Sequence, residues 1–227
     1  MTSIDGVVTL GSKPLAGSEI SGRYQADRFL MGLLRATADA VLLGAGTLRA
    51  TPGHQWTPAH VYPDAAPAFA RLRSELGRKP EPRLVLLTAS GDVAFSHPAV
   101  ARGATVVTTR DGAAVLRPLL PESCDVIEVG KSGPVDMRRA ITELRERGFA
   151  VILTEGGPHV MAELIQHELL DEAFITISPM VAGRDEERRL SMVAGAEFLP
   201  DHGVWTRMLS ARKHGEYLFL RYGLRPA

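Results

Sequence analysis

Short apolar runs alternate with amphipathic stretches along most of the chain, and this alternation limits the possible folds more than any other feature. Runs of four or five Val, Ile and Leu residues that end at a turn residue are typical of strands buried on both faces. Between them, apolar residues recur with helical spacing, as at Phe29, Leu30, Leu33 and Leu34. Strands that alternate with helices predict a mainly parallel sheet covered on both faces.

The expected elements follow one another in a regular order. Strands are predicted at 40–43, 84–88, 105–109, 126–129, 149–153 and 173–178, after a short apolar run at 7–10. Helices are predicted at 23–37, 66–76, 111–120, 135–147 and 159–167, with Asp111 as the cap of the third. Two last strands, 205–212 and 216–222, predict an antiparallel hairpin. We therefore expect one α/β domain over residues 1–227, with a mixed, mainly parallel sheet flanked by helices.

Segment 50–67 interrupts this order. It contains four Pro and two His residues and no clear periodicity. Its composition predicts a surface excursion inside the domain that is too short to be a linker.

Charge and cysteine content exclude several classes of protein. The 227 residues include 26 Lys and Arg and 26 Asp and Glu, so the formal net charge is zero and neither nucleic acid nor an anionic membrane is an expected partner. No run approaches the ~18 apolar residues of a membrane span, and the N-terminus shows no signal peptide, so we expect a cytoplasmic protein. A single cysteine, Cys124, excludes a disulfide framework and a Cys-based zinc site within the chain. The His residues are scattered, and no metal site is predicted.

Two glycine-rich turns carry the clearest chemical signal. Gly44-Ala45-Gly46-Thr47 and Glu155-Gly156-Gly157-Pro158 each follow a predicted strand and open a predicted helix. Glycines let a phosphate approach the backbone, and a helix N-terminus offers free N–H groups. Two such turns suit a ligand with two phosphates, such as a dinucleotide, but tight packing turns explain the same residues. Neither turn matches a P-loop or the Rossmann fingerprint.

Asp27 stands at the head of the first long predicted helix. It serves either as an N-terminal charge that the helix dipole favours, or, in an apolar cleft, as a carboxyl group with a raised pKa that donates a proton. The sequence leaves both roles open.

Four motifs in a fixed order resemble the reductase domain of bacterial riboflavin biosynthesis, a relative of dihydrofolate reductase. They are the opening Ser3-Ile4-Asp5-Gly6, the block from Leu34-Arg35-Ala36 through Asp39-Ala40-Val41-Leu42-Leu43-Gly44-Ala45-Gly46-Thr47, the turn Glu155-Gly156-Gly157-Pro158, and Leu170-Asp171-Glu172 with Ile177-Ser178-Pro179. The resemblance spans nearly the whole chain. It implies a dihydrofolate reductase-like α/β fold.

The resemblance implies an oxidoreductase with NADPH as hydride donor. Gly44, Gly46 and Thr47 would line one side of the cofactor, and Glu155, Gly156 and Gly157 would cradle its pyrophosphate. Thr88 and Ser90 would face the adenosine 2′-phosphate, with Arg49 or Arg110 supplying positive charge.

The resemblance also implies the reaction. In pyrimidine reductases of this type, a hydride reaches the anomeric carbon of the sugar as an imine, and a ribosylamino group becomes a ribitylamino group. Asp27 resembles the acidic residue that faces the substrate, so it is assigned to substrate orientation or proton donation. Ser3, Asp5 and Trp56 are assigned to substrate binding, although Trp56 would equally serve to close its loop.

Two departures bear on the substrate. The family carries D-D-P-x-L-T-x-R after the glycine turn, whereas residues 49–56 here read RATPGHQW, without the Asp pair or that Arg. The family also has a strand just before the S-I-D-G motif, whereas this sequence begins two residues before Ser3. No deaminase segment precedes the motif here, which leads us to expect a stand-alone reductase. A paralogous reductase of another heterocycle such as dihydrofolate, a non-catalytic dinucleotide-binding protein and a purely structural domain remain alternatives. The family further implies a homodimer through C-terminal strands such as 217–222.

Overall fold

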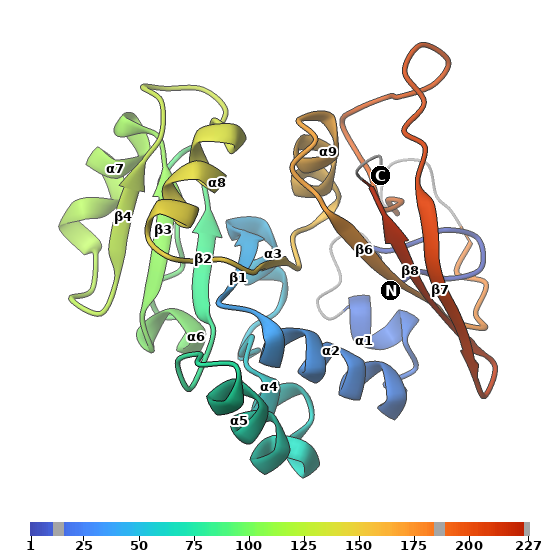
Figure 1. The fold of residues 1–227 in the computed structure, drawn as a ribbon. Coiled ribbons are helices and arrows are strands. Elements are labelled where there is room, and N and C mark those ends of the chain that lie inside the picture. Colours follow the sequence, from blue (N-terminus) through green and yellow to red (C-terminus); the bar gives the residue numbers. More distant parts are fainter. Residues whose placement is uncertain (11–15, 184–188, 225–227) are drawn as a thin grey trace. The chain divides into compact units, whose positions relative to one another are not determined.

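The computed structural model describes residues 1–10, 16–183 and 189–224 (Figure 1). The chain divides into two compact units. One consists of Met1–Asp27 with Gly157–Ala227, and the other of Arg28–Gly156.

The unit Arg28–Gly156 contains a five-stranded parallel sheet in the order β4-β3-β2-β1-β5. Its strands are β1 (Ala40–Gly44), β2 (Arg83–Leu87), β3 (Ala104–Thr108), β4 (Asp125–Glu128) and β5 (Ile152–Thr154). The predicted parallel strands are therefore confirmed, with ends that shift by one to three residues. The first strand of this sheet, β1, lies in its interior. The following strands are added outward to β4, and β5 then pairs on the other side of β1 (Figure 1).

Side chains alternate between the two faces of this sheet, and both faces are buried. Val41, Leu43, Leu84, Leu86 and Val106 share one apolar cluster with residues of α3 (Ala45–Ala50), α6 (Pro98–Ala101) and α7 (Arg110–Leu116). Figure 1 places α8 (Met137–Glu146) beside the strands, with four buried residues on its inner stripe. The alternation of strands and helices thus produces the covered sheet that the sequence predicts.

Helix ends follow capping chemistry. Helix α7 begins at Arg110, one residue earlier than predicted, because the Thr109 hydroxyl accepts a hydrogen bond from Gly112 N and is the cap in place of Asp111. Asp136 caps α8 by accepting from Arg139 N. Helices α2 (Gln25–Thr37) and α5 (Ala66–Glu75) agree with prediction, and Gly77 with its φ of 66° follows α5.

Segment 50–67 differs from the predicted surface excursion. It contains the short helices α4 (Pro58–Val61) and η1 (Pro63–Ala65), and Trp56 within it is only 5% exposed. The indole joins the apolar cluster under the sheet. Burial of one large aromatic side chain holds a segment whose composition resembles a loop.

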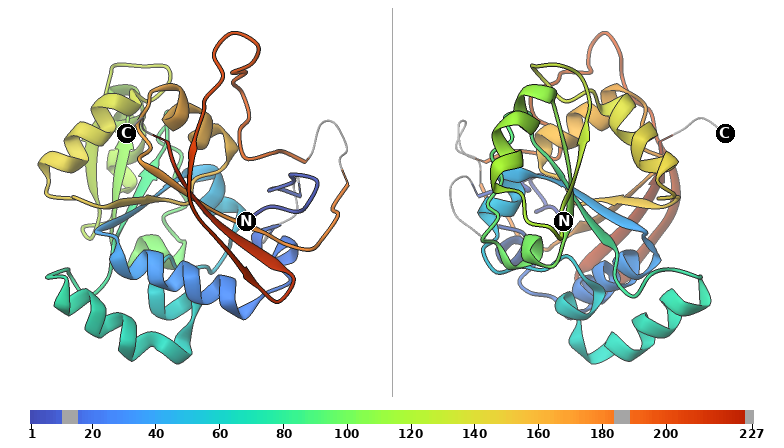
Figure 2. Two further views of the ribbon diagram at one scale, coloured as in Figure 1. Left: turned by 45° about the vertical axis from the view of Figure 1, so that its right-hand side comes forward. Right: turned by 90° about the vertical axis from the view of Figure 1, so that its left-hand side faces the viewer.

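The other unit contains the antiparallel sheet β6-β8-β7. Its strands β6 (Glu172–Ile177), β7 (Arg207–His214) and β8 (Tyr217–Gly223) include the predicted C-terminal hairpin, which Figure 2 shows as a long twisted ribbon. The parallel and antiparallel strands therefore form two sheets. Helices α1 (Ala16–Ile20) and α9 (Pro158–Gln166) complete the unit.

The N-terminal residues of this unit form little regular structure. The apolar run at 7–10 is not a strand. Thr2 instead forms an isolated parallel bridge with Ile177 at the edge of β6. Within the described residues, no helix is long and apolar enough to cross a membrane.

Candidate functional site

The carboxyl ends of β5, β1 and β2 lie side by side, because β1 pairs with β5 on one side and with β2 on the other. Gly44 is in register with Leu87, and Leu42 with Thr154. The segments that follow these strands start with Ala45, Thr88 and Glu155. The two glycine turns therefore follow neighbouring strands, for the residues up to Gly156. Ligands of open α/β sheets bind at such an edge, where the strand order reverses.

Gly46 lies in the first turn of α3, where no feature of the chain itself requires glycine. Outside its own helix, a Cβ atom built on Gly46 meets no atom of the described residues within 4 Å. Gly44 is the N-cap residue of α3. It has an ordinary φ of −79° and provides no side-chain hydrogen bond to the first turn of the helix. Open space beside a backbone free of side chains fits the close approach of a phosphate or a ribose. The residues present therefore fit a dinucleotide on this side.

The Glu155-Gly156 turn is held by internal hydrogen bonds. Glu155 N donates to Leu42 O at 3.0 Å, and Gly156 N donates to the Thr154 hydroxyl at 3.2 Å. These two amides are therefore not the free donors that an amide cradle for a pyrophosphate needs. Gly157 belongs to the other unit, where it is the N-cap of α9.

The Glu155 carboxylate is bound by Arg35, a residue with no predicted role beyond its place in a motif. Arg35, in the last turn of α2, donates from Nε to Glu155 Oε1 and from Nη2 to Oε2, both at 2.7 Å. The Arg35 side chain is 3% exposed and that of Glu155 is 14% exposed. A charge-assisted bidentate pair with this burial fixes the orientation of both groups.

His54 completes this cluster as an acceptor. Arg35 Nη2 lies 3.1 Å from His54 Nε2, and a guanidinium only donates, so this ring nitrogen carries a lone pair. Burial lowers the pKa of His54 to about 3, and the neighbouring charges of Arg35, His60, His97 and Arg28 lower it further in that direction. His54 is therefore a neutral imidazole at physiological pH.

The segment after β2 carries the predicted adenosine-side residues. Thr88 is buried and Ser90 is exposed, with their hydroxyl oxygens 3.5 Å apart. Arg49 Nη1 is bound to Asp92 Oδ2 at 3.1 Å. Arg110, at the start of α7, is exposed and forms no ion pair with the described residues. Of the two arginines, Arg110 has the charge that is free to meet an anion.

Ser3 and Asp5 build a turn in the other unit. The Ser3 hydroxyl donates to Asp5 Oδ1 at 2.6 Å and accepts from Val7 N at 2.9 Å. Asp5 also accepts from the amides of Ala182 and Gly183. The hydrogen bonds from Ser3 and Ala182 lower the pKa of Asp5 to about 2. Both carboxylate oxygens thus anchor the segment at 182–183.

Asp27 is 8% exposed and lies in the first turn of α2. An acidic group there interacts favourably with the helix dipole. Its burial fits the second role considered for it, a carboxyl group in a restricted environment, equally well.

Trp56 is placed by its packing. Its ring lies 4.9 Å from that of His54 and 5.9 Å from that of His97, measured between centroids. His97 in turn contacts Thr51 O through Nε2 at 3.0 Å. This burial fits the alternative in which Trp56 closes its loop better than an open face for a substrate ring.

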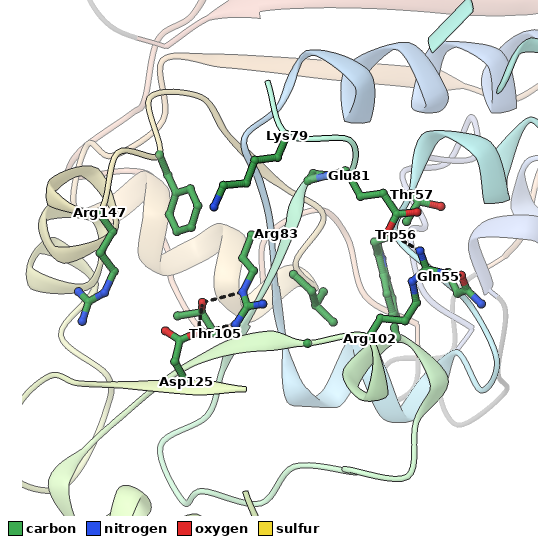
Figure 3. Close-up of a pocket in the computed structure, with 15 residues that line it drawn as sticks. Gln55, Trp56, Thr57, Lys79, Glu81, Arg83, Arg102, Thr105, Asp125 and Arg147 are labelled. Atoms are coloured by element: carbon green, nitrogen blue, oxygen red, sulfur yellow. Dashed lines mark hydrogen bonds and ion pairs between the residues drawn. The ribbon is translucent and has the colours of Figure 1, made fainter. Parts of the chain in front are cut away.

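A pocket of about 390 Å³ lies at the opposite edge of the sheet, beside the first residues of β2, β3 and β4 (Figure 3). Several of its charged side chains satisfy one another. Arg83 pairs with Asp125, and Arg102 pairs with Glu81. The pocket is therefore distinct from the carboxyl edge that holds the glycine turns.

Comparisons with known proteins agree with this architecture. A pyrimidine reductase-like protein from Corynebacterium diphtheriae matches with a TM-score of 0.75 and 24% identity, over 100% of this chain and 90% of that one. RibD from Acinetobacter baumannii matches with a TM-score of 0.70 and 18% identity over 99% of this chain, which spans 56% of that protein. Riboflavin biosynthesis reductase Rib7 from Saccharomyces cerevisiae matches with a TM-score of 0.60 and 14% identity, over 99% of this chain and 85% of that one. These likenesses confirm the fold expected from the sequence.

A search of curated proteins gave no match. The sequence does match a family model, that of the RibD C-terminal domain, over residues 1–206. Because this match covers most of the chain, the resemblance inferred from the four motifs is confirmed. The chain belongs to the RibD C-terminal domain family.

Proposed function

We propose that this protein is an NADPH-dependent reductase of the riboflavin-pathway type, acting on a ribosylamino-pyrimidine phosphate such as 5-amino-6-(5-phosphoribosylamino)uracil. The observation that carries the proposal is the adjacency of the segments after β5, β1 and β2, with the open backbone at Gly46 between them. Membership of the RibD C-terminal domain family supports a reductase function, which we assign to this edge of the sheet.

The adenosine end of the cofactor is assigned to the segment after β2. Thr88 and Ser90 offer hydroxyl groups there, and Arg110 offers a charge that no described residue pairs with. A guanidinium recognises a phosphate by paired hydrogen bonds, which supports a preference for NADPH over NADH. Arg49 is the weaker candidate because Asp92 already neutralises it.

The chemical step is assigned to Asp27. The nicotinamide supplies the hydride when it is bound. The Asp27 carboxyl group would orient the substrate or donate a proton to the sugar-ring oxygen as the ring opens. Gly44, Gly46 and Thr47 would allow the cofactor to lie against the backbone, and Ser3 and Asp5 would shape the substrate side by holding the 182–183 segment.

The first experiment is a thermal shift with NADPH, with NADH and without ligand. A ligand at 100 times its Kd that binds only the native state adds about 2.7 kcal/mol, which for a chain of this size raises Tm by roughly 5–10 °C. A larger rise with NADPH than with NADH is expected. No shift with either nucleotide contradicts the proposal.

The second experiment measures NADPH oxidation with candidate substrates. The ribosylamino-pyrimidine phosphate should accelerate it, and Asp27→Asn should lower kcat by about 100-fold or more with little change in the Kd of NADPH. The divergent segment 49–56 makes another heterocycle, such as dihydrofolate, the second candidate, and competition between the two substrates separates them. Full turnover by Asp27→Asn contradicts its assigned role.

We further propose that the protein is a cytoplasmic homodimer. In the sheet β6-β8-β7, β7 is an edge strand, and unpaired edge groups favour pairing with another chain. Apolar side chains accompany this region, with Trp205 91% exposed and Met208 and Leu218 also exposed. Light scattering at micromolar concentration should give twice the chain mass of 24.5 kDa. A monomer contradicts the proposal.

A further inference from the structure

Arg35 uses all of its hydrogen-bond donors within the unit Arg28–Gly156. A guanidinium has five N–H donors in a fixed planar arrangement. Nε and one Nη2 hydrogen serve Glu155, and the other Nη2 hydrogen serves His54. Nη1 faces the carbonyl oxygens of Gln55 and Thr57, each at 3.4 Å. Every donor has an acceptor, and all acceptors lie in two short segments.

These two segments are remote in sequence. Residues 55–57 line the pocket at the opposite edge of the sheet, whereas the Glu155-Gly156 turn lies at the carboxyl edge where we propose the cofactor. The first, 54–57, belongs to the stretch in which this chain departs from its family. The second is the Glu155-Gly156 turn at the end of β5, 120 residues from Arg35 along the chain. The direct connection between the two segments runs through one buried cation on a third element, α2.

The chemistry of the contacts makes this connection specific. Glu155 needs a partner because an unpaired buried carboxylate is costly. His54 accepts only as the neutral ring, which its environment enforces. Lysine would preserve the positive charge but would not reproduce the planar fork that reaches a carboxylate, an imidazole and two carbonyls together.

We propose that Arg35 is a positioning residue that holds the Glu155-Gly156 turn and segment 54–57 in one fixed arrangement, and that this arrangement sets the affinity for the dinucleotide. The inference rests on the proposed function for the identity of the ligand. The connection itself rests only on the contacts of Arg35. Arg35 therefore acts through the two segments and has no assigned contact with the cofactor.

The test uses the full-length chain with matched substitutions. Arg35→Lys keeps the charge and removes the fork. Arg78→Lys is the control, because Arg78 forms another partly buried arginine–carboxylate pair, with Asp39, and shares no side-chain partner with Arg35 among the described residues. Arg35→Met alone would leave the Glu155 carboxylate without its arginine partner and would risk a failure to fold. The double variant Arg35→Met/Glu155→Gln removes both charges and avoids this cost.

Two measurements are made on each variant: the Kd of NADPH, from the change in its fluorescence on binding, and hydrogen–deuterium exchange of peptides covering 54–57 and 155–156. Arg35→Lys should raise the Kd about 10- to 100-fold, since small misplacements of a positioning element have effects of this size. Exchange should become faster in both segments with Arg35→Lys and with the double variant. Arg78→Lys should change neither the Kd nor these two peptides.

The outcomes separate the two proposals. An unchanged Kd for Arg35→Lys, or faster exchange in only one segment, overturns the positioning role. If the wild type does not bind NADPH, the proposed function and its link to Arg35 both fall. In that case, faster exchange in both segments of the variants still supports the connection of the two segments through Arg35. Unchanged exchange in both segments contradicts this connection.

Discussion

Gly91 and Gly112 pack backbone against backbone, with the loop after β2 pressed onto the first turn of α7. A Cβ atom on Gly91 would overlap the carbonyl oxygen of Gly112, and one on Gly112 would lie 2.6 Å from Ala89 O. Gly91 also has a φ of 76°. This contact places the loop that carries Ser90.

Gly91→Ala should lower the free energy of unfolding by about 2–4 kcal/mol, because it combines a left-handed backbone with a steric overlap. Urea unfolding measures the change. Gly130→Ala is the matched control, since Gly130 has a φ of 79° but open space around its Cβ position. It should cost only about 1–2 kcal/mol. Equal losses for the two variants would show that the contact with Gly112 contributes nothing.

Gly46→Ala should separate ligand binding from stability. The added methyl group meets no atom of the chain, and alanine in a helix is favoured over glycine by roughly 0.5–1 kcal/mol. Stability should therefore stay the same or rise, while the Kd of NADPH increases by about tenfold or more because the methyl group occupies the space proposed for the cofactor. Titration calorimetry and urea unfolding measure the two quantities. Unchanged affinity would place the cofactor away from α3.

Asp5 should keep its charge in moderately acidic solution. Its folded pKa is about 2, below the ordinary value of 3.8, because hydrogen bonds from Ser3, Ala182 and Gly183 stabilise the carboxylate. Its contribution to stability is therefore complete above pH 3.8 and is lost as the pH falls through about 2. NMR titration of the carboxyl carbon gives the pKa directly. A value near 3.8 would show that the anchor at 182–183 is not formed in solution.

His54 should make stability depend on pH over a higher range. Its folded pKa of about 3 lies below the ordinary 6.5, so the unfolded chain binds a proton that the folded chain does not. This contribution is complete above pH 6.5 and decreases as the pH falls from 6.5 toward 3. The free energy of unfolding should therefore rise less steeply with pH between pH 4 and 6 in His54→Gln than in the wild type. The difference in slope should correspond to about one proton.

Exposed His202 provides the control for His54. His202→Gln removes a histidine without disturbing the contacts of Arg35. The same slope in both variants, measured by urea unfolding at several pH values, would mean that the His54 ring is protonated in the folded state.

Arg73 should be a structural residue that stabilises the C-terminal end of α2. Its Nη1 donates to the carbonyl oxygens of Arg35, Ala36 and Ala38 at the end of α2, within an almost fully buried site. Arg73→Met would leave these acceptors unsatisfied and lower the free energy of unfolding by about 2–4 kcal/mol. Arg71→Met, at an exposed position of the same helix, should change it by less than about 0.5 kcal/mol. Similar losses would contradict the capping role.

The carboxyl edge of the parallel sheet was predictable because its strand-to-helix turns have a distinctive local composition, an apolar run followed by glycines. The turns at Gly44 and Gly156 both follow strands, as the sequence pattern predicts, and these two strands pair with each other. The motifs also identified the family, since their order does not depend on the details of packing. Domain organisation as a single unit over 1–227 stays a prediction.

Long-range contacts of single side chains were not predictable. Arg35 is part of a recognised motif, but nothing local shows that its partners are Glu155 and His54. The burial of Trp56 could not be predicted from its Pro-rich surroundings, because most of the apolar residues that cover it are remote in sequence. Helix caps fall between these cases, because Thr109 and Asp111 are both good caps and only the backbone geometry selects Thr109.

The order β4-β3-β2-β1-β5 also has a kinetic consequence. Strand β1 pairs with β2, the next strand along the chain, but its pairing with β5 closes a loop of more than one hundred residues, since Thr154 reaches Leu42 across 112 positions. Contacts with such high sequence separation form late, because their loop-closure entropy must be met before they stabilise the chain. A ribosome-bound chain that ends before β5 can assemble strands β1 to β4 and still lack the Glu155 turn. Acquisition of dinucleotide affinity would then wait for the last strand of the parallel sheet.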